Sequence, residues 1–344
     1  MNLEKLTIEG YKSIGKIEIV KPNPFTVFVG PNASGKSNIF EAIEFLEFCD
    51  FMNVFEVSKL FGGNDSIRNK ISNSENDRVI KFYLNFGEWE SSINLFPSRN
   101  TDNFVSTLFH YGTANRLPER ENVNSTKKDY WKLPEYRHFI NYSRLFIGQL
   151  SRLQKIDDSR ISTYGYKQSN LEKVLKRILK DESKREEIFE ILQLLIPGFE
   201  RVEIVSSELS GRDDLIVYET GIKKPLNKGL ISDGTFNIIS ILAALYQSDE
   251  PQFLCIEEPE NGINPIVVKE LVNIIRDICE EKGHYIWLNT HSQSLVSVLS
   301  KEEIIIVDKK NGLTEIKQIQ DMDLHGLRMD DALYTNSIGG GNPW

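Results

Sequence analysis

The sequence predicts an α/β protein, and three segments support this prediction. The apolar run Phe25–Val29 leads into a glycine-containing loop, Gly30–Asn38, which opens a stretch of helical character. Two further apolar runs end in polar residues, one within 253–258 and one within 287–292. Buried strands that deliver polar side chains at their ends, with helices between them, are typical of α/β folds.

The residues before the loop are expected to form paired strands. Apolar and polar residues alternate roughly in Leu3–Ile8 and again in Ile14–Ile19. This period of two is typical of half-buried strands. Residues 51–125 are polar and rich in Asn and Ser, which favours loops and short strands, with one strand candidate at Val79–Phe86.

Helices are expected in the second half of the chain. Apolar residues keep helical spacing on both sides of a charged break at Asp181–Ser183, and Pro197-Gly198 ends the second helix. We interpret their apolar faces as packing surfaces, and a partner groove is the alternative. A markedly apolar helix follows Thr235.

Composition excludes several classes of protein. The net charge of −9 over 344 residues argues against a chain that coats nucleic acid with its whole surface, although a local basic groove stays open. No apolar run approaches the roughly 18 residues of a membrane span, and no signal-peptide pattern is found, so we expect a cytoplasmic protein without membrane contact. Three cysteines without zinc spacing are expected to be reduced. Gly339–Gly341 is expected to be a mobile tail.

The loop after the first apolar run has the pattern of a phosphate-binding loop. Its glycines let backbone N–H groups surround phosphates, Lys36 is suited to the β- and γ-phosphates, and the Ser37 hydroxyl is suited to Mg²⁺. An ordinary glycine turn is the alternative. The predicted nucleotide-binding residues are Gly30, Pro31, Asn32, Ala33, Ser34, Gly35, Lys36, Ser37 and Asn38.

Two adjacent carboxylates end the apolar strand 253–258. One carboxylate of such a pair can hold Mg²⁺ while the next activates the water that attacks the γ-phosphate. We assign Glu257 to the metal and Glu258 as the general base. A solvated acidic loop is the alternative, because Pro259–Gly262 has turn chemistry.

Two further polar segments are candidates for phosphate contact. Ser232, Asp233 and Gly234 precede the apolar helix, whose N-terminal N–H groups and dipole attract anions. A simple N-cap is the alternative for this segment. His291 lies in the polar quartet after the third apolar run, where it is suited to contact the γ-phosphate or to orient the attacking water.

Together these motifs resemble those of ABC-class ATPases of the RecF, SMC and OLD group, close to the stand-alone AAA15/AAA21-type ATPases of prokaryotes. Gly30–Asn38 resembles the Walker A loop of that group and 253–258 its Walker B strand. Residues 231–235 resemble its signature motif, 258–265 its D-loop region and 289–292 its switch-histidine loop. The turn at 10–14 resembles an N-terminal turn near the nucleotide, which adds Lys12 to the expected nucleotide-binding residues.

The chain departs from the wider pattern in several places. Glu257 stands where ABC transporters have Asp, and Asp233-Gly234-Thr235 replaces their Gly-Gly-Gln. Gln149 and Gln154 are the candidates for a Q-loop glutamine. We recognise no TOPRIM nuclease domain after the strand expected at Ile304–Asp308.

The resemblance implies an architecture and two cofactors. It implies an ABC-type head with an N-terminal antiparallel β region, a mainly parallel core sheet flanked by helices, and a largely helical insertion. Residues 1–50 and 226–344 would form a discontinuous core, and 51–225 an inserted lobe. ATP and Mg²⁺ would be bound.

The resemblance also implies partners. Two heads would form a homodimer or higher oligomer around ATP, with Ser232, Asp233 and Gly234 acting in trans. The leading hypothesis is an ATPase that regulates a separately encoded effector protein in antiphage defence. The alternatives are a RecF-like DNA-repair ATPase and a slow scaffold that holds a toxic partner. Nucleic acid stays open as a partner at Lys127–Lys167, where basic and aromatic residues interleave with acids.

Overall fold

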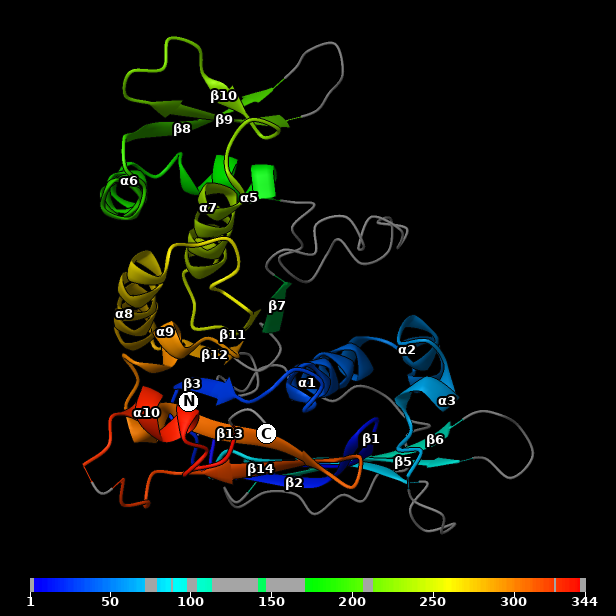
Figure 1. Ribbon diagram of the computed structural model, residues 1–344. Helices are drawn as coiled ribbons and strands as arrows, with labels where there is room; N and C mark the ends of the chain where they lie inside the picture. Colours follow the sequence, from blue (N-terminus) through cyan, green and yellow to red (C-terminus); the bar gives the residue numbers. More distant parts are fainter. Residues whose placement is uncertain are drawn as a thin grey trace. The chain divides into compact units, whose positions relative to one another are not determined.

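The computed structural model describes residues 3–71, 79–87, 89–97, 104–112, 142–146, 171–206, 213–324 and 326–340. The chain divides into two compact units (Figure 1). Unit 1 contains Met1–Tyr142 and Leu299–Trp344, and unit 2 contains Ser143–Val298. The phosphate loop belongs to unit 1, whereas the carboxylate pair, the signature segment and His291 belong to unit 2.

Unit 1 is built on strands in the order β6-β5-β4-β1-β2-β14-β13-β3. Strands β1 and β2 pair antiparallel, as the alternation predicts, and β4 to β6 extend this antiparallel region from β1. Strand β13 pairs in parallel with the fully buried β3. The strands are β1 (Lys5–Tyr11), β2 (Ile14–Val20), β3 (Phe25–Val29), β4 (Ile80–Asn85), β5 (Trp89–Pro97), β6 (Phe104–Gly112), β13 (Ile304–Lys310) and β14 (Leu313–Gln318).

Helix α1 (Lys36–Phe51) follows the phosphate loop directly. Its apolar side packs on the sheet, where Phe40 meets Phe28 edge-on and Phe45 stacks on Phe82. The other helices of unit 1 are α2 (Val54–Leu60), α3 (Asn64–Ile67), the short 3₁₀ helix η5 (Lys301–Glu303) and α10 (Met329–Tyr334).

The C-terminal glycines correct one expectation. Gly340 is buried and its N–H donates to the Asp308 carboxylate, with 3.0 Å to Oδ1. A Cβ at Gly340 would lie 2.9 Å from Ile306 and 3.2 Å from the Val29 carbonyl oxygen. Gly339 and Gly340 are therefore packed against the ends of β3 and β13, and the prediction of a mobile tail is wrong for them. Gly341 lies outside the described residues.

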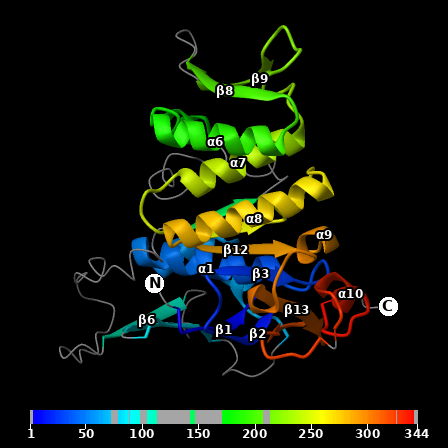
Figure 2. The ribbon, with the colours of Figure 1, turned by 90° about the vertical axis from the view of Figure 1, so that its left-hand side faces the viewer.

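Unit 2 combines a parallel strand pair with a helical layer and a small sheet (Figure 2). Strand β11 pairs in parallel with β12, β7 is the other neighbour of β11, and β8 to β10 form a separate antiparallel sheet. The elements are β7 (Tyr142–Phe146), α5 (Leu171–Ile178), α6 (Glu182–Leu195), β8 (Phe199–Ser206), β9 (Asp213–Glu219), β10 (Leu226–Asn227), α7 (Asp233–Tyr246), β11 (Phe253–Glu257), α8 (Pro265–Lys282), β12 (Tyr285–Thr290) and α9 (Gln293–Val296).

The core of unit 2 follows from its apolar sequence. Helix α7 is buried from Gly234 to Tyr246, which explains its apolar composition on all sides. It contacts α5 and α6, and these helices also pack against β8, so their apolar faces are packing surfaces as expected. Every residue of β11 and β12 is buried. Two continuous apolar strands in parallel are typical of a sheet covered on both faces.

The predicted secondary structure is largely confirmed. The two helices flanking the charged break, the helix after Ser232 and the strand near Ile80 are all present. The described part of 51–225 contains α2, α3, α5 and α6 together with β4 to β9.

Candidate functional site

The phosphate loop is held in one shape by two glycines that have no room for a side chain. Gly35, the N-cap of α1, has φ 105°, a left-handed conformation that glycine tolerates best. A Cβ there would lie 2.0 Å from Thr314 Oγ1, and a Cβ at Gly30 would lie 2.0 Å from the Val307 carbonyl oxygen. Larger residues at either position would displace the loop.

A chain of side-chain hydrogen bonds supports this loop from behind. Thr314 Oγ1 donates to the Ser34 carbonyl oxygen at 2.9 Å and lies 2.6 Å from Ser13 Oγ, which accepts from Asn38 Nδ2 at 2.7 Å. Because the Thr314 proton is used on Ser34, the Ser13 hydroxyl donates to Thr314. The chain therefore runs in one direction, from the Asn38 amide to the loop backbone.

The loop lysine lies inside the loop. Lys36 is 7% exposed, and its ammonium donates to the carbonyl oxygens of Gly30 at 2.7 Å and Pro31 at 3.0 Å. Helix α1 begins at this residue, so the positive end of its dipole points at the loop. This combination of an ammonium, a helix N-terminus and glycine turns suits a phosphate chain.

Lys12 lies at the β1–β2 turn with φ 47°. Its ammonium forms an ion pair with Glu41 on α1, and the Tyr11 hydroxyl donates to the same carboxylate at 2.8 Å. The neighbouring Ser13 contacts Asn38, so the turn lies beside the start of α1. A nucleotide contact by Lys12 stays a prediction.

In unit 2, the carboxylate of Glu257 has protein partners on both oxygens. Arg144 on β7 donates to Oε1 through Nε at 2.6 Å and also through Nη2. Asn289 Nδ2 donates to Oε2 at 3.0 Å. Arg144 lies within the stretch Lys127–Lys167, where nucleic acid stays open as a partner. Its side chain is only 4% exposed, so this residue does not fit such a surface.

Glu258 has a special backbone conformation and an accessible carboxylate. Its φ is 50°, which is rare for a residue with a side chain and rarer still before a proline. The Glu258 N–H donates to both the carbonyl oxygen and Oδ1 of Asn289, at 3.0 and 3.1 Å. Strain of this kind persists only where neighbours hold it, and it concentrates at functional sites.

The Glu258 side chain lies near the predicted switch histidine. Asn261 Nδ2 donates to Glu258 Oε2 at 2.8 Å, and His291 Nδ1 lies 3.8 Å from Oε1. The side chains of Glu258 and His291 are 40% and 45% exposed, so both are open to a water molecule or a ligand. The turn after β11 therefore gives two adjacent glutamates different environments, since Glu257 is enclosed and Glu258 is accessible.

Asn289 is the residue that the sequence reasoning missed. It was part of the polar quartet but was given no role. Its side chain is 1% exposed. The side-chain Nδ2 donates to the Glu257 carboxylate, and both the side-chain Oδ1 and the backbone carbonyl oxygen accept from the Glu258 N–H. The register of the parallel pair, with Glu257 opposite Asn289, explains this contact. The sequence signal for this role is an asparagine at the end of the apolar strand that lies beside the Walker B strand.

Glu260 is a second enclosed carboxylate in the same turn. Thr290 Oγ1 donates to its Oε1, while its Oε2 is buried without a hydrogen-bond partner among the described residues. Burial raises the pKa of Glu260, and the Thr290 hydrogen bond opposes this only in part. Folding therefore favours the protonated form of this residue.

The signature segment forms the start of α7. Ser232 is the N-cap, and its Oγ accepts from the Thr235 N–H at 3.1 Å. Ser232 and Asp233 are exposed, whereas Gly234 is buried against the D-loop turn, where a Cβ would lie 2.4 Å from the Gly262 carbonyl oxygen. Asn237 Nδ2 donates to the Asn261 carbonyl oxygen at 2.8 Å. Unit 2 therefore joins the signature segment, the D-loop turn and Glu258.

The donor types suit magnesium. A serine hydroxyl at 37 and a carboxylate at 257 are hard oxygen ligands of the kind that Mg²⁺ takes, usually together with phosphate oxygens and water. Within the part of the chain that the structure describes, no group of three or more His, Cys, Asp or Glu residues forms a metal site by itself.

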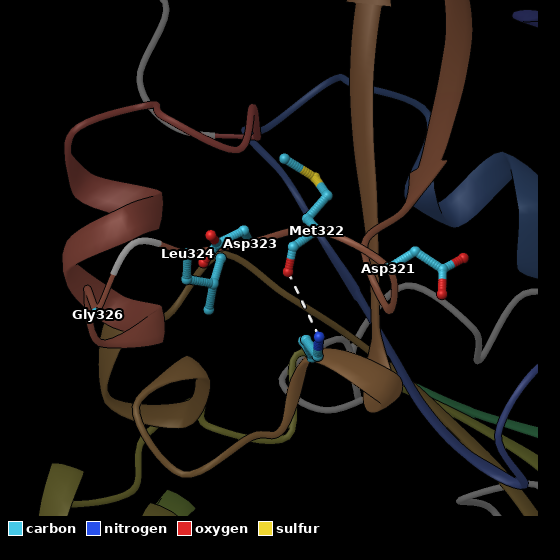
Figure 3. A pocket seen from close by; sticks show the side chains of 6 residues that line it. Asp321, Met322, Asp323, Leu324 and Gly326 are labelled. Carbon is cyan, nitrogen blue, oxygen red and sulfur yellow. Dashed lines mark hydrogen bonds between the residues drawn. The ribbon is translucent and has the colours of Figure 1, made fainter.

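A cavity of about 380 Å³ lies elsewhere in unit 1 (Figure 3). Lys301 donates to the Met322 carbonyl oxygen at 3.4 Å across it. None of the predicted site residues lines it. The lining residues are Lys301, Asp321, Met322, Asp323, Leu324 and Gly326.

Two features predicted from the sequence fall outside the described residues. These are the Q-loop candidates Gln149 and Gln154, and the stretch Lys127–Lys167 except for residues 142–146.

Comparison with protein families gives one match that spans most of the chain. The model of the family described as "AAA domain, putative AbiEii toxin, Type IV TA system" (AAA_21) matches residues 25–297. This range contains the phosphate loop, the signature segment, the carboxylate pair and His291. The chain belongs to the AAA_21 family.

The fold of this AAA_21 protein is that of SMC heads. It matches the SMC head domain from Thermotoga maritima with a TM-score of 0.53 and 16% identity, covering 92% of this chain and 99% of that one. For the Smc head bound to the C-winged helix domain of ScpA the TM-score is 0.59, with 17% identity and coverage of 96% and 100%. For the Pyrococcus furiosus Smc head with an extended coiled coil it is 0.56, with 16% identity and coverage of 98% and 99%. The predicted α/β fold and the predicted AAA21-type family are confirmed.

Two curated relatives have informative names. A Helicobacter pylori protein named ATP/GTP phosphatase is 21% identical over 333 residues, covering 87% of this chain and 88% of that protein. The chromosome partition protein Smc of Methanocaldococcus jannaschii is 48% identical over 46 residues, which is 13% of this chain and only 4% of that protein.

The described part of the chain has no helix that is both long and apolar enough to cross a bilayer.

Proposed function

We propose that this AAA_21 protein is a Mg²⁺-dependent ATPase head. The observation that carries the proposal is the turn after β11, where Asn289 holds Glu258 in a strained conformation with its carboxylate accessible beside His291. A base whose backbone is fixed and whose side chain is open suits the activation of water. The phosphate loop and its rear hydrogen bonds support nucleotide binding, and the name of the Helicobacter relative supports hydrolysis.

Each predicted residue has a role in this proposal. Gly30–Asn38 binds the phosphates through backbone N–H groups and Lys36, with Lys12 as an added contact. Glu258 accepts a proton from the attacking water, and His291 orients that water or contacts the γ-phosphate. Ser37 and Glu257 would hold Mg²⁺, which when bound would offset charge on the phosphate oxygens.

We further propose that two copies of this chain assemble around ATP, with Ser232, Asp233 and Gly234 of one copy facing the phosphates of the other. Ser232 and Asp233 are exposed at the N-terminus of a 14-residue helix, which suits a phosphate. Two apolar side chains beside this segment and the D-loop turn support an interface, because Leu230 is 66% exposed and Ile266 is 78% exposed.

The wider role that fits best is control of a separately encoded effector, in antiphage defence. The description of the matched family, which names a putative AbiEii toxin of a type IV toxin–antitoxin system, supports such a setting. In this proposal residues 1–50 and 226–344 form the ATPase core, and residues 51–225 form an inserted lobe.

Light scattering after size-exclusion chromatography tests the assembly. Glu258→Gln should keep nucleotide binding but block hydrolysis, so it should form a dimer or higher oligomer only with ATP and Mg²⁺. Lys36→Ala is the matched control and should stay in its starting state. Assembly that is constant in both variants, with or without ATP, would contradict the ATP-dependent dimer. Salt-sensitive binding of DNA by the wild type would favour the RecF-like alternative.

A further inference from the structure

The ion pair between Arg144 and Glu257 in unit 2 is almost completely enclosed. Its side chains are 4% and 8% exposed. Taking a carboxylate out of water is costly unless an opposite charge and hydrogen bonds replace the water. Here the guanidinium supplies the charge on Oε1, and Asn289 supplies the hydrogen bond on Oε2.

The geometry leaves little of this carboxylate for another cation. Both Nε and Nη2 of Arg144 lie on the same oxygen, and Asn289 Nδ2 lies on the other at 3.0 Å. A divalent cation bound directly to a carboxylate oxygen lies about 2.0 to 2.6 Å from it. Such a cation would lie inside the space used by these donors, so direct coordination of Glu257 requires at least one donor to move away.

We propose that Arg144 and a divalent cation are alternative counter-ions of Glu257. In this proposal Arg144 is a positioning residue, which neutralises and orients the carboxylate until a cation replaces it. It therefore weakens the intrinsic affinity of the carboxylate for a cation. The inference rests on the proposed role of Glu257 at the metal, and it concerns an arginine for which neither the sequence motifs nor the comparisons provide a role.

The location of Arg144 supports this role. It lies on β7, the strand hydrogen-bonded beside β11, so it reaches the end of the Walker B strand from a neighbouring strand rather than from a distant loop. A purely structural ion pair would predict something different, namely that cations leave the pair untouched. The two possibilities therefore separate when the arginine is removed and metal is added.

Thermal unfolding of the full chain without nucleotide tests the proposal. Arg144→Met keeps the length of the side chain but leaves the Glu257 carboxylate buried without its cation. In EDTA we expect its melting temperature to fall by on the order of 5 °C or more. MnCl₂ should restore at least half of that loss, while it should move the wild type little. The double variant Arg144→Met/Glu257→Gln has no carboxylate to neutralise and should not respond to MnCl₂.

A second readout covers the case in which Arg144→Met does not fold. Arg144→Lys keeps the positive charge but loses the forked geometry of the guanidinium. Electron paramagnetic resonance of added Mn²⁺ should show tighter binding to Arg144→Lys than to the wild type, on the order of tenfold. Equal Mn²⁺ affinity, or equal thermal shifts in wild type and Arg144→Met, would overturn the proposal. Because no nucleotide is used, a failure of the ATPase proposal would show separately, as absent ATP binding.

Discussion

A substitution at Asn289 can perturb the pair Glu257 and Glu258 without changing the volume of the side chain at position 289. Asn289→Asp keeps the shape of the side chain and the oxygen that accepts from the Glu258 N–H. It replaces the Nδ2 donor by a carboxylate oxygen that faces Glu257 Oε2, where the present distance is 3.0 Å. The change therefore converts a hydrogen bond into a repulsive contact in a buried place.

The size of the effect follows from this distance. Two unit charges 3.0 Å apart repel by about 5.5 kcal/mol at an effective dielectric constant of about 20. Displacing the pair relieves part of this repulsion. If about half of it, roughly 2.7 kcal/mol, is lost from the transition state, kcat falls about 100-fold. KM for ATP should change less than about threefold, because the phosphate loop is held by its own contacts.

The assay is steady-state phosphate release over a range of ATP concentrations. Asn273→Asp is the matched control. The side chain of Asn273 accepts a hydrogen bond from Arg276 on α8, and among the described residues it forms no hydrogen bond with a carboxylate of the site. We expect this control to have wild-type kcat. A normal kcat in Asn289→Asp, or an equal fall in both variants, would refute the role given to Asn289.

Three further perturbations have defined outcomes. Thr314→Val should leave the Ser34 carbonyl without its donor and weaken binding of a fluorescent ATP analogue by roughly tenfold, while Thr314→Ser should bind normally; equal binding by both would contradict the rear support of the loop. Because burial raises the pKa of Glu260 in the folded chain, the contribution of Glu260 to stability should be fully present below about pH 4.5, the ordinary pKa, and should be lost as pH rises through the raised pKa. Chemical denaturation should therefore show the free energy of unfolding of Glu260→Gln rising relative to that of the wild type as pH increases above about 4.5. A difference between the two proteins that does not change with pH would refute the raised pKa of Glu260. Gly234→Ala puts a methyl group 2.4 Å from a backbone oxygen and should cost about 1 to 3 kcal/mol in thermal unfolding, whereas Gly221→Ala, whose methyl group meets open space and whose only strain comes from its φ of 82°, should cost about 1 kcal/mol.

Local patterns predicted much of the fold. The strand, loop and helix around Gly30–Asn38 could be predicted because glycine turns and a buried apolar run have strong local signatures. The N-cap at Ser232 was equally visible, since a serine before an apolar helix needs no tertiary contact. These elements depend on residues that are close together in the sequence.

Other features depended on contacts between distant residues. Thr314 supports a loop that lies 280 positions earlier in the sequence, through a hydroxyl that carries no motif. Arg144 looked like one basic residue among many, until its strand was placed beside β11. Gly340 looked like part of a tail, but Asp308 binds its N–H. Strand order and register decide such contacts, and neither can be obtained from local periodicity.

The most direct test of the account compares ATP binding and ATP hydrolysis in Glu258→Gln and Lys36→Ala. Binding of a labelled ATP and release of phosphate would be measured with Mg²⁺ on wild type and on both variants. The account predicts that Glu258→Gln binds ATP like the wild type but has lost hydrolysis, whereas Lys36→Ala has lost binding. Equal loss of ATP affinity in both variants, or normal hydrolysis by Glu258→Gln, would contradict the central claim that Glu258 is the base of an ATPase.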